Sequence, residues 1–377
     1  MNTAFFLIKP VSGRCNLACR YCFYHDLAEH RRTRDYGLMD FGTSDLLIER
    51  AFDLNADGLT FIFQGGEPTL AGLEYFEHFV EKSRACAESS PHHRPQIHFS
   101  IQTNGLTLNT EWARFFKREG FLVGVSVDGP RMIHDRYRTH RDGSGTWAQV
   151  MHGIGLLRGE GIPVNALCVV NDLTADNAEL VYRHLRLRGF DWIQFIPCLP
   201  PLTEGATALY EALSPEAYAR FLKKVFDLRY EEWLRRAALY VRWFDNLVGM
   251  AAGIPPESCG MLGCCPVNFT VEADGSVYPC DFYVTDEWRL GNIHELSFQT
   301  MKEGVVARKF VESSHHIDPA CRTCPAFFLC RGGCRREREP FPDGKPRLNR
   351  YCSSFREFFS YSGERIMKMA TTLKETP

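Results

Sequence analysis

The feature that most constrains the fold is a regular alternation of two kinds of segment over residues 4–197. Short apolar, β-branched or aromatic runs alternate with longer amphipathic stretches, which predicts strands alternating with helices. The expected strands are Phe5–Lys9, Leu59–Gln64, Gln96–Thr103, Phe121–Val127, Val164–Val170 and Trp192–Pro197. The expected helices are Ser44–Asn55, Leu73–Ala87, Asn109–Glu119, Thr146–Glu160 and Thr174–Arg188. This order predicts a parallel sheet. The pattern alone allows an open doubly wound sheet or a partial barrel, because a full barrel needs eight such units.

Composition narrows the class of protein. The chain of 377 residues has a formal net charge of −2, which gives no overall electrostatic sign of a nucleic-acid partner. Its first apolar run, Phe5–Ile8, is too short for a signal peptide and ends at Lys9–Pro10. No segment reaches the roughly 18 apolar residues of a membrane helix. We therefore expect a soluble, cytoplasmic protein that binds neither nucleic acid nor membranes.

Fifteen cysteines stand out in a chain without an export signal. Because the cytosol keeps thiols reduced, metal binding explains them better than disulfides. Three of them form the motif Cys15-x3-Cys19-x2-Cys22. Three thiolates at this spacing can hold three irons of a [4Fe–4S] cluster and leave the fourth iron open for chemistry. A zinc knuckle is the alternative, although zinc wants four ligands and the nearest further candidate is His25.

Nine more cysteines fall between residues 259 and 352. They are Cys259, Cys264, Cys265, Cys280, Cys321, Cys324, Cys330, Cys334 and Cys352. Eight thiolates would complete two further four-iron clusters and leave one cysteine over. A zinc ribbon at the run 321–334 is the alternative, and it leaves the other cysteines unexplained.

The first motif resembles the signature of radical S-adenosylmethionine (SAM) enzymes. That resemblance favours a partial (β/α)6 barrel, with SAM bound to the open iron. Gln64-Gly65-Gly66-Glu67, after the second expected strand, is similar to the family's motif that holds the methionyl amino group. By the same resemblance, Ser126 and Arg138 would secure the methionyl carboxylate, and Arg suits that task by its bidentate geometry. Tyr24, beside the cysteine motif, is a further candidate that either faces the ligands or packs.

The later cysteines resemble the SPASM extension of radical SAM enzymes that modify peptides and proteins. This resemblance implies interleaved ligands, so that each cluster ties distant segments together. One cluster would be held by Cys259, Cys265, Cys280 and Cys334, and the other by Cys321, Cys324, Cys330 and Cys352. The choice between the neighbours Cys264 and Cys265 stays open. Three [4Fe–4S] clusters and SAM are thus the expected cofactors.

Within this group the chain resembles the anaerobic sulfatase-maturating enzymes over nearly its whole length. The residues that carry this resemblance are Leu7–Pro10, Cys22–His25, Phe63–Gly72, Val125–Pro130, Tyr278–Tyr283 and Trp288–Asn292. The resemblance implies oxidation of a Cys or Ser, in a Cys/Ser-x-Pro-x-Arg segment of an unfolded sulfatase, to Cα-formylglycine. It also implies a flavodoxin or ferredoxin as electron donor. Asp281, next to Cys280, is then the candidate general base.

We expect three parts in the chain: a radical SAM barrel (1–235), a SPASM domain (236–354) and a C-terminal helix (355–377). A long helical stretch from Ser214 to about Met250 is expected to lead out of the barrel. Two other functions stay open at this stage. One is a SPASM maturase that crosslinks peptides through thioether or carbon–carbon bonds, and the other is a non-catalytic zinc or iron–sulfur scaffold.

Overall fold

The computed structural model describes residues 2–89, 94–202, 213–339 and 346–375. The chain divides into two compact units, each built from segments that are distant in the sequence. The first unit contains residues 1–126, 135–164 and 267–310, and the second contains residues 127–134, 165–266 and 311–377. The three-part division expected from the sequence stays a prediction.

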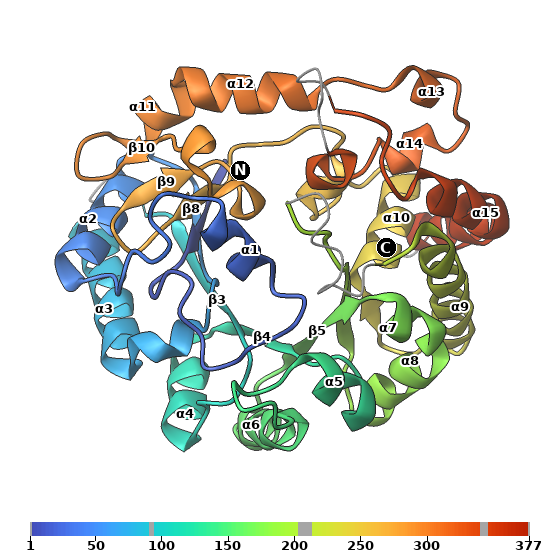
Figure 1. Ribbon diagram of the computed structural model, residues 1–377, viewed down its shortest axis with the longest axis horizontal. Helices are drawn as coiled ribbons and strands as arrows, with labels where there is room; N and C mark the ends of the chain where they lie inside the picture. Colours follow the sequence, from blue (N-terminus) through green and yellow to red (C-terminus); the bar gives the residue numbers. More distant parts are fainter. Residues whose placement is uncertain (1, 90–93, 203–212, 340–345, 376–377) are drawn as a thin grey trace. The chain divides into compact units, whose positions relative to one another are not determined.

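The first unit is organised around parallel strands (Figure 1). Its strand order is β10-β9-β8-β1-β2-β3-β4. β8 pairs in parallel with β1, whereas β9 pairs antiparallel with both β8 and β10. The strands are β1 (Thr3–Ile8), β2 (Gly58–Phe63), β3 (Gln96–Thr103), β4 (Leu122–Ser126), β8 (Phe269–Val271), β9 (Ser276–Tyr278) and β10 (Gly291–Asn292). Thus a late segment of the chain, which includes β8, pairs directly with the first strand.

Alternating side chains explain how these strands pack. In β2, Leu59, Phe61 and Phe63 are fully buried. Phe61 and Phe63 each contact the ring of Phe79 on α3 edge to face, at 5.1 Å between centroids. Burying such rings against a helix is the main stabilising contribution of this layer. The helices of this part are α1 (Phe23–Glu29), α2 (Phe41–Phe52), α3 (Leu73–Ser89), α4 (Thr110–Glu119), α6 (Trp147–Gly159) and the 3-10 turn η1 (Pro68–Ala71).

The second unit repeats the arrangement with β5 (Val164–Val170), β6 (Trp192–Pro197) and β7 (Tyr240–Val241), which are paired in parallel. Its C-terminal helix α15 (Cys352–Glu375) packs along α9 (Pro215–Leu234) and α10 (Arg242–Ala252). Aromatic contacts such as Phe226 with Phe358, at 5.5 Å, join these helices. The other helices here are α7 (Asp172–Asp176), α8 (Ala178–Leu187), α13 (Pro319–Arg322), α14 (Phe327–Cys330) and the 3-10 turns η3 (Cys259–Met261) and η6 (Arg335–Arg338).

Five further helical segments complete the described chain: the helices α5 (Arg131–Tyr137), α11 (Phe298–Glu303) and α12 (Val305–Ser314) and the 3-10 turns η4 (Asp281–Tyr283) and η5 (Asp286–Trp288). No helix in the described ranges is both long and apolar enough to cross a membrane.

Strand positions agree closely with the sequence prediction, whereas two helices differ. The continuous helical stretch expected over 214–250 is wrong, because α9 ends at Leu234 and the strand β7 intervenes before α10. Arg236 adopts a left-handed φ of 56°, and Tyr240 N–H then donates to Asp191 O in the sheet. Pairing with β6 therefore overrides the helix propensity of this segment. The helix expected over 174–188 is likewise broken at Asn177 into α7 and α8.

Candidate active site

The candidate residues of the first unit follow the carboxyl ends of neighbouring parallel strands. The cysteine motif lies between β1 and α1, Gln64-Gly65-Gly66-Glu67 follows β2, and Asn104 follows β3. Because these strands are parallel, their carboxyl ends meet at one edge of the sheet, where ligands of such sheets bind. The structure thus brings the first two sequence motifs together as expected.

The cysteine loop is held by its own backbone and by a later segment. Ala18 N–H donates to Thr139 O and Arg20 N–H donates to Tyr137 O. Cys22 begins α1 as its N-cap residue. Burial raises the pKa of the Cys15 thiol to about 12 and that of Cys22 to about 11, with the neighbouring cysteines adding to both shifts. Such thiols become ligands when a metal displaces their protons.

Two glycines allow the loop after β2 to lie against the cysteine loop. A Cβ on Gly66 would lie 2.1 Å from Arg14 O, and the residue has a φ of +55°. A Cβ on Gly65, at a φ of +92°, would lie 2.6 Å from the Lys9 side chain. Glycine is needed where two backbones approach this closely in a left-handed conformation. Glu67 N–H then donates to Arg14 O at 2.8 Å, which joins the two motifs.

Glu67 is fully buried and surrounded by donors. Its Oε1 accepts from Thr69 N at 3.2 Å, from Thr69 Oγ1 at 2.6 Å and from Thr103 Oγ1 at 2.7 Å. Its Oε2 accepts from Asn104 N at 2.6 Å. Burial raises the pKa of Glu67, and these hydrogen bonds counteract the rise. The result is a carboxylate fixed in one orientation beside the cysteine loop.

Asp281 forms a second buried cluster with Tyr24 and Gln64. Tyr24 OH donates to Asp281 Oδ2 at 2.6 Å, and Gln64 Nε2 donates to the same oxygen at 3.1 Å and to Tyr24 OH at 2.8 Å. Asp281 Oδ1 is buried and has no hydrogen-bond partner among the described residues. Burial raises the pKa of Asp281, and the charge of Lys9 together with the Tyr24 hydrogen bond opposes that rise. Hydrogen bonds therefore hold Oδ2 in place, whereas the buried Oδ1 is available to accept a proton or a hydrogen bond.

A buried ion cluster lies beside this group. Glu272 Oε1 pairs with Lys9 Nζ at 2.8 Å and with Arg31 NH1 at 2.6 Å, and all three side chains are almost fully buried. Lys9 Nζ also lies 4.8 Å from the centroid of the Tyr24 ring. Removing one member of such a cluster leaves a buried charge uncompensated, which costs about 3–5 kcal/mol. Through Lys9, this cluster therefore contacts the ring of the same tyrosine whose hydroxyl binds Asp281.

The structure places Ser126 and Arg138, the two residues expected at the SAM carboxylate, in the first unit. Ser126 is the last residue of β4. Arg138 is buried, donates to Tyr21 OH at 3.0 Å, and lies close enough to Cys22 to lower the pKa of that thiol. Arg138 is thus beside the cysteine loop, as a ligand to a molecule bound there would need to be.

Three of the four cysteines expected to hold one auxiliary cluster gather in the second unit. Burial raises the pKa of Cys334 well above its ordinary value, and Cys259 and Cys265 add to the rise. A Cβ on Gly260 would lie 3.4 Å from the Cys334 Cβ. Cys265 and Cys259 thus lie near Cys334, and the choice between Cys264 and Cys265 as ligand stays a prediction. The fourth expected ligand, Cys280, precedes η4 in the first unit.

All four cysteines of the other expected set gather within the second unit. Burial raises the pKa of Cys330 to about 12, with contributions from Cys352, Cys321 and Cys324. Cys324 N–H donates to Cys321 O, and Asn349 binds Gly332 O and receives the N–H of Cys352 on its carbonyl. In the described ranges, no three His, Cys, Asp or Glu side chains converge on a single metal ion. A four-iron cluster instead spreads its thiolates over separate irons.

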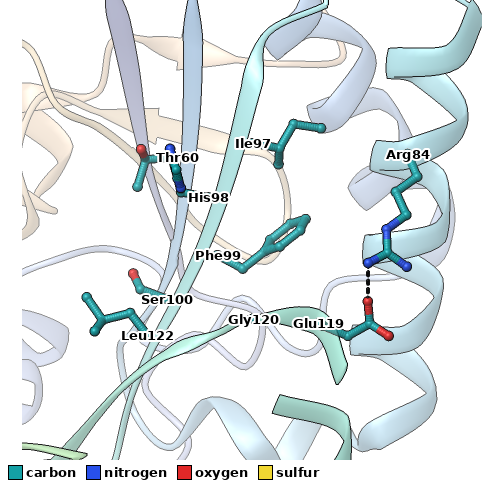
Figure 2. A pocket seen from close by; sticks show the side chains of 9 residues that line it. All are labelled: Thr60, Arg84, Ile97, His98, Phe99, Ser100, Glu119, Gly120 and Leu122. Atoms are coloured by element: carbon teal, nitrogen blue, oxygen red, sulfur yellow. Dashed lines mark ion pairs between the residues drawn. The ribbon is translucent and has the colours of Figure 1, made fainter. Parts of the chain in front are cut away.

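A cavity of about 440 Å³ lies elsewhere, at the amino-terminal half of the strands (Figure 2). It is lined by Thr60, Arg84, Ile97, His98, Phe99, Ser100, Glu119, Gly120 and Leu122. The Arg84–Glu119 ion pair, at 2.5 Å, lies at its side. None of the expected site residues lines this cavity, so we assign it no part in the chemistry.

Sequence reasoning found most of these groups but missed how they connect. It named Tyr24 and Gln64 as candidates for cofactor binding, which stays a prediction, and did not find that both bind Asp281. It missed the Lys9–Arg31–Glu272 cluster and the donor Thr69. Lys9 carried a signal, because a lysine that ends an apolar strand directly before a ligand loop is unusual in a buried position.

Comparisons with known families and proteins agree with this geometry. The model of the radical SAM superfamily matches residues 10–185, and that of an iron–sulfur cluster-binding domain, SPASM, matches residues 264–325. The chain is 39% identical, over 99% of both chains, to a cysteine-type anaerobic sulfatase-maturating enzyme of Clostridium novyi. It is 31% identical to a serine-type enzyme of Bacteroides thetaiotaomicron, over 95% of this chain and 89% of that protein. The matched domains imply iron–sulfur clusters and SAM as cofactors.

A solved structure described as native anSMEcpe with bound AdoMet and Cp18Cys peptide matches with a TM-score of 0.93 and 39% identity. The match covers 99% of this chain and 100% of that one. Streptococcus suis SuiB bound to its precursor peptide SuiA matches with a TM-score of 0.59 and 14% identity, over 93% and 76% of the two chains, which shows the fold alone. The expected fold class, a partial (β/α)6 barrel followed by a SPASM domain and a C-terminal helix, is confirmed.

Proposed function

The chain belongs to the anaerobic sulfatase-maturating enzymes of the radical SAM superfamily, and on this premise we propose that it converts a sulfatase residue to Cα-formylglycine. The target is a Cys or Ser in a Cys/Ser-x-Pro-x-Arg segment of the unfolded sulfatase. The observation that carries the proposal is the buried Tyr24–Gln64–Asp281 cluster, which includes residues beside both radical SAM motifs. In this cluster, Asp281 Oδ1 has no hydrogen-bond partner among the described residues. Such an oxygen suits a group that must accept a proton from a bound thiol or hydroxyl.

Three [4Fe–4S] clusters are part of the proposal. Cys15, Cys19 and Cys22 would hold the first. The mutual proximity of Cys259, Cys265 and Cys334 supports one auxiliary site, completed by Cys280. The grouping of Cys321, Cys324, Cys330 and Cys352 supports the other.

SAM would be held where the two first-unit motifs join. Gly65 and Gly66 let the loop after β2 lie against Lys9 and Arg14, and Glu67, which ends that loop, would accept the ammonium of SAM. Ser126 and Arg138 would bind the methionyl carboxylate. When bound, SAM and the clusters supply the radical that removes a hydrogen atom from the substrate Cβ, and the acceptor for the remaining electron.

The proton of the substrate is transferred to a residue of this chain. Asp281 Oδ1 accepts the proton of the substrate thiol or hydroxyl, while Tyr24 and Gln64 hold Oδ2 in place. Loss of one hydrogen atom, one proton and one electron turns a cysteine into a thioaldehyde. Water then hydrolyses the thioaldehyde to the aldehyde with release of hydrogen sulfide, and a serine gives the aldehyde directly.

A flavodoxin or ferredoxin would supply the electron that starts each turnover. An open hollow of about 620 Å³ lies at the outer side of the cysteine loop, lined by Cys15, Asn16, Arg141 and neighbouring residues of the 140–149 segment. Arg141 there donates to Cys15 O at 3.2 Å. Because Cys15, an expected ligand of the first cluster, lines this hollow, the hollow supports delivery of electrons by an external protein.

The decisive experiment is a mass spectrum of a Cys-x-Pro-x-Arg peptide after anaerobic incubation with the reconstituted protein, SAM and a reductant. We expect loss of the thiol sulfur and appearance of an aldehyde, which an aldehyde-reactive hydrazine would confirm. If deoxyadenosine forms while the peptide stays unchanged, the sulfatase assignment is wrong. A peptide that loses two hydrogens, keeps its sulfur, gives no hydrazone, and whose fragment ions show a bond between two residues would identify a crosslinking maturase instead.

A further inference from the structure

Asn104 links the two halves of the first site. It follows β3, is only 5% exposed, and donates its backbone N–H to Glu67 Oε2 at 2.6 Å. Its side-chain Nδ2 donates to Asn16 Oδ1 at 2.7 Å and to Cys15 Sγ at 3.7 Å. A single residue therefore touches both the carboxylate expected at SAM and a sulfur expected at the first cluster.

The orientation of this side chain is fixed by the backbone. Leu106 N–H donates to Asn104 Oδ1 at 3.0 Å, and a backbone N–H can only donate. The amide oxygen must therefore face Leu106, so the NH2 group faces Cys15 and Asn16. Its direction toward the sulfur follows from this pairing.

The sulfur of Cys15 receives donors from two sides. Leu17 N–H donates to it at 3.4 Å, in addition to Asn104 Nδ2. Reducing a [4Fe–4S] cluster by one electron adds one negative charge, which spreads onto the ligand sulfurs. Hydrogen bonds to those sulfurs stabilise the reduced form and raise the reduction potential. The effect is larger in a buried site, where water screens little.

We propose that Asn104 is a positioning residue that raises the reduction potential of the first cluster through its hydrogen bond to Cys15. This inference rests on the proposed cluster at Cys15, Cys19 and Cys22, but not on the identity of the peptide substrate. The side-chain amide of Asn104 also donates to Asn16 Oδ1, which holds the residue next to Cys15. Its backbone N–H separately binds Glu67, the carboxylate proposed to bind the ammonium of SAM.

The test is an anaerobic potentiometric titration of the full-length holoprotein, followed by electron paramagnetic resonance. The signal that changes on addition of SAM belongs to the first cluster, which separates it from the auxiliary clusters. Asn104→Leu removes the donor without adding charge. Asn104→Asp also removes it but keeps the acceptor for Leu106 N–H, so this variant preserves the turn if the Leu variant does not fold.

We expect both variants to shift the one-electron reduction equilibrium of this cluster by about two- to tenfold toward the oxidised form. The upper end corresponds to a potential lower by about 59 mV. Iron and sulfide contents should equal those of the wild type, because Asn104 is not a ligand.

Thr103→Val is the matched control. Thr103 is the neighbouring residue, and its hydroxyl donates to Glu67 Oε1 and accepts from Gly105 N–H. The substitution therefore removes a donor to Glu67 and leaves the donors to the Cys15 sulfur in place. The control should weaken SAM binding and leave the potential unchanged. An unchanged potential in both Asn104 variants, or an equal shift in Thr103→Val, would overturn the inference alone. Absence of any SAM-sensitive signal in the wild type would overturn it together with the proposed cluster.

Discussion

Two of the buried carboxylates of the first unit, Glu67 and Asp281, differ in how their oxygens are paired. Glu67 accepts four hydrogen bonds from described residues, and both of its oxygens are engaged. Asp281 accepts two on Oδ2, while Oδ1 is buried without a partner among the described residues. Burial raises the pKa of both groups. Glu67 and Asp281 therefore differ in the number of hydrogen-bond donors around their oxygens and not in the effect of burial on their pKa values.

This contrast separates two kinds of task. A carboxylate whose oxygens are all engaged keeps one geometry and can anchor a charged ligand. A carboxylate with a buried, unsatisfied oxygen stores a desolvation cost of about 1–3 kcal/mol until a donor arrives. In Asp281 that cost favours binding of a substrate that brings an O–H or S–H group. The two carboxylates should thus respond differently to mutation.

A substitution that displaces Glu67 should have the largest effect on activity. In Gly66→Ala the new Cβ would meet Arg14 O, and the left-handed backbone alone costs about 1–3 kcal/mol. We expect displacement of Glu67, loss of iron from the first site, and no detectable deoxyadenosine by liquid chromatography. Gly155→Ala is the control, because a Cβ there meets nothing within 4 Å and the site is helical. Normal SAM cleavage by Gly66→Ala would contradict the anchoring role.

A substitution of Asp281 should suppress formylglycine formation and leave the cleavage of SAM intact. Asp281→Asn keeps the shape of the side chain but cannot accept the substrate proton as a carboxylate does. Since general-base catalysis contributes about 10²–10⁴-fold, formylglycine formation should fall at least 100-fold. Deoxyadenosine release should continue, so the ratio of deoxyadenosine to aldehyde rises. A wild-type rate of aldehyde formation in this variant would show that another group takes the proton.

Tyr24→Phe should give an intermediate effect. The change removes the donor at 2.6 Å from Asp281 Oδ2 but leaves Gln64 on the same oxygen. A hydrogen bond to a charged group contributes about 1.5–3 kcal/mol, so aldehyde formation should fall by roughly tenfold or more. Tyr36→Phe, which removes a hydroxyl paired with Tyr278 OH, provides a control of similar kind. Equal losses in the two variants would point to stability rather than to Asp281, and thermal denaturation would measure this.

The sequence predicted what is local and missed what is assembled from distant segments. The bounds of β3, β5 and β6 agree with the prediction, because apolar runs between turn residues define strands well. The break after Leu234 was missed, since Arg235–Ala237 are ordinary helix formers and only pairing of β7 with β6 ends the helix.

The site shows the same division. Cys15, Cys19 and Cys22 are predicted from their spacing, and the two glycines before Glu67 from their resemblance to the family's motif. Tyr24 and Asp281 are separated by 257 positions, and nothing in the local sequence of either indicates that they share a hydrogen bond. Asn104 and Cys15 are likewise joined only by the packing of β3 beside the cysteine loop.

The smallest effect should come from removing one of the four hydrogen bonds that Glu67 accepts. Thr69→Val removes the hydroxyl at 2.6 Å from Glu67 Oε1, yet the backbone N–H of the same residue, Thr103 and Asn104 remain. One hydrogen bond of about 1 kcal/mol predicts a roughly fivefold weaker SAM affinity, measured by equilibrium dialysis. Thr107→Val removes only a hydroxyl that contacts Thr69 Oγ1, so its effect should be smaller still. If Thr69→Val weakened SAM binding as severely as Gly66→Ala, Glu67 would depend on a single donor, and the contrast with Asp281 would be lost.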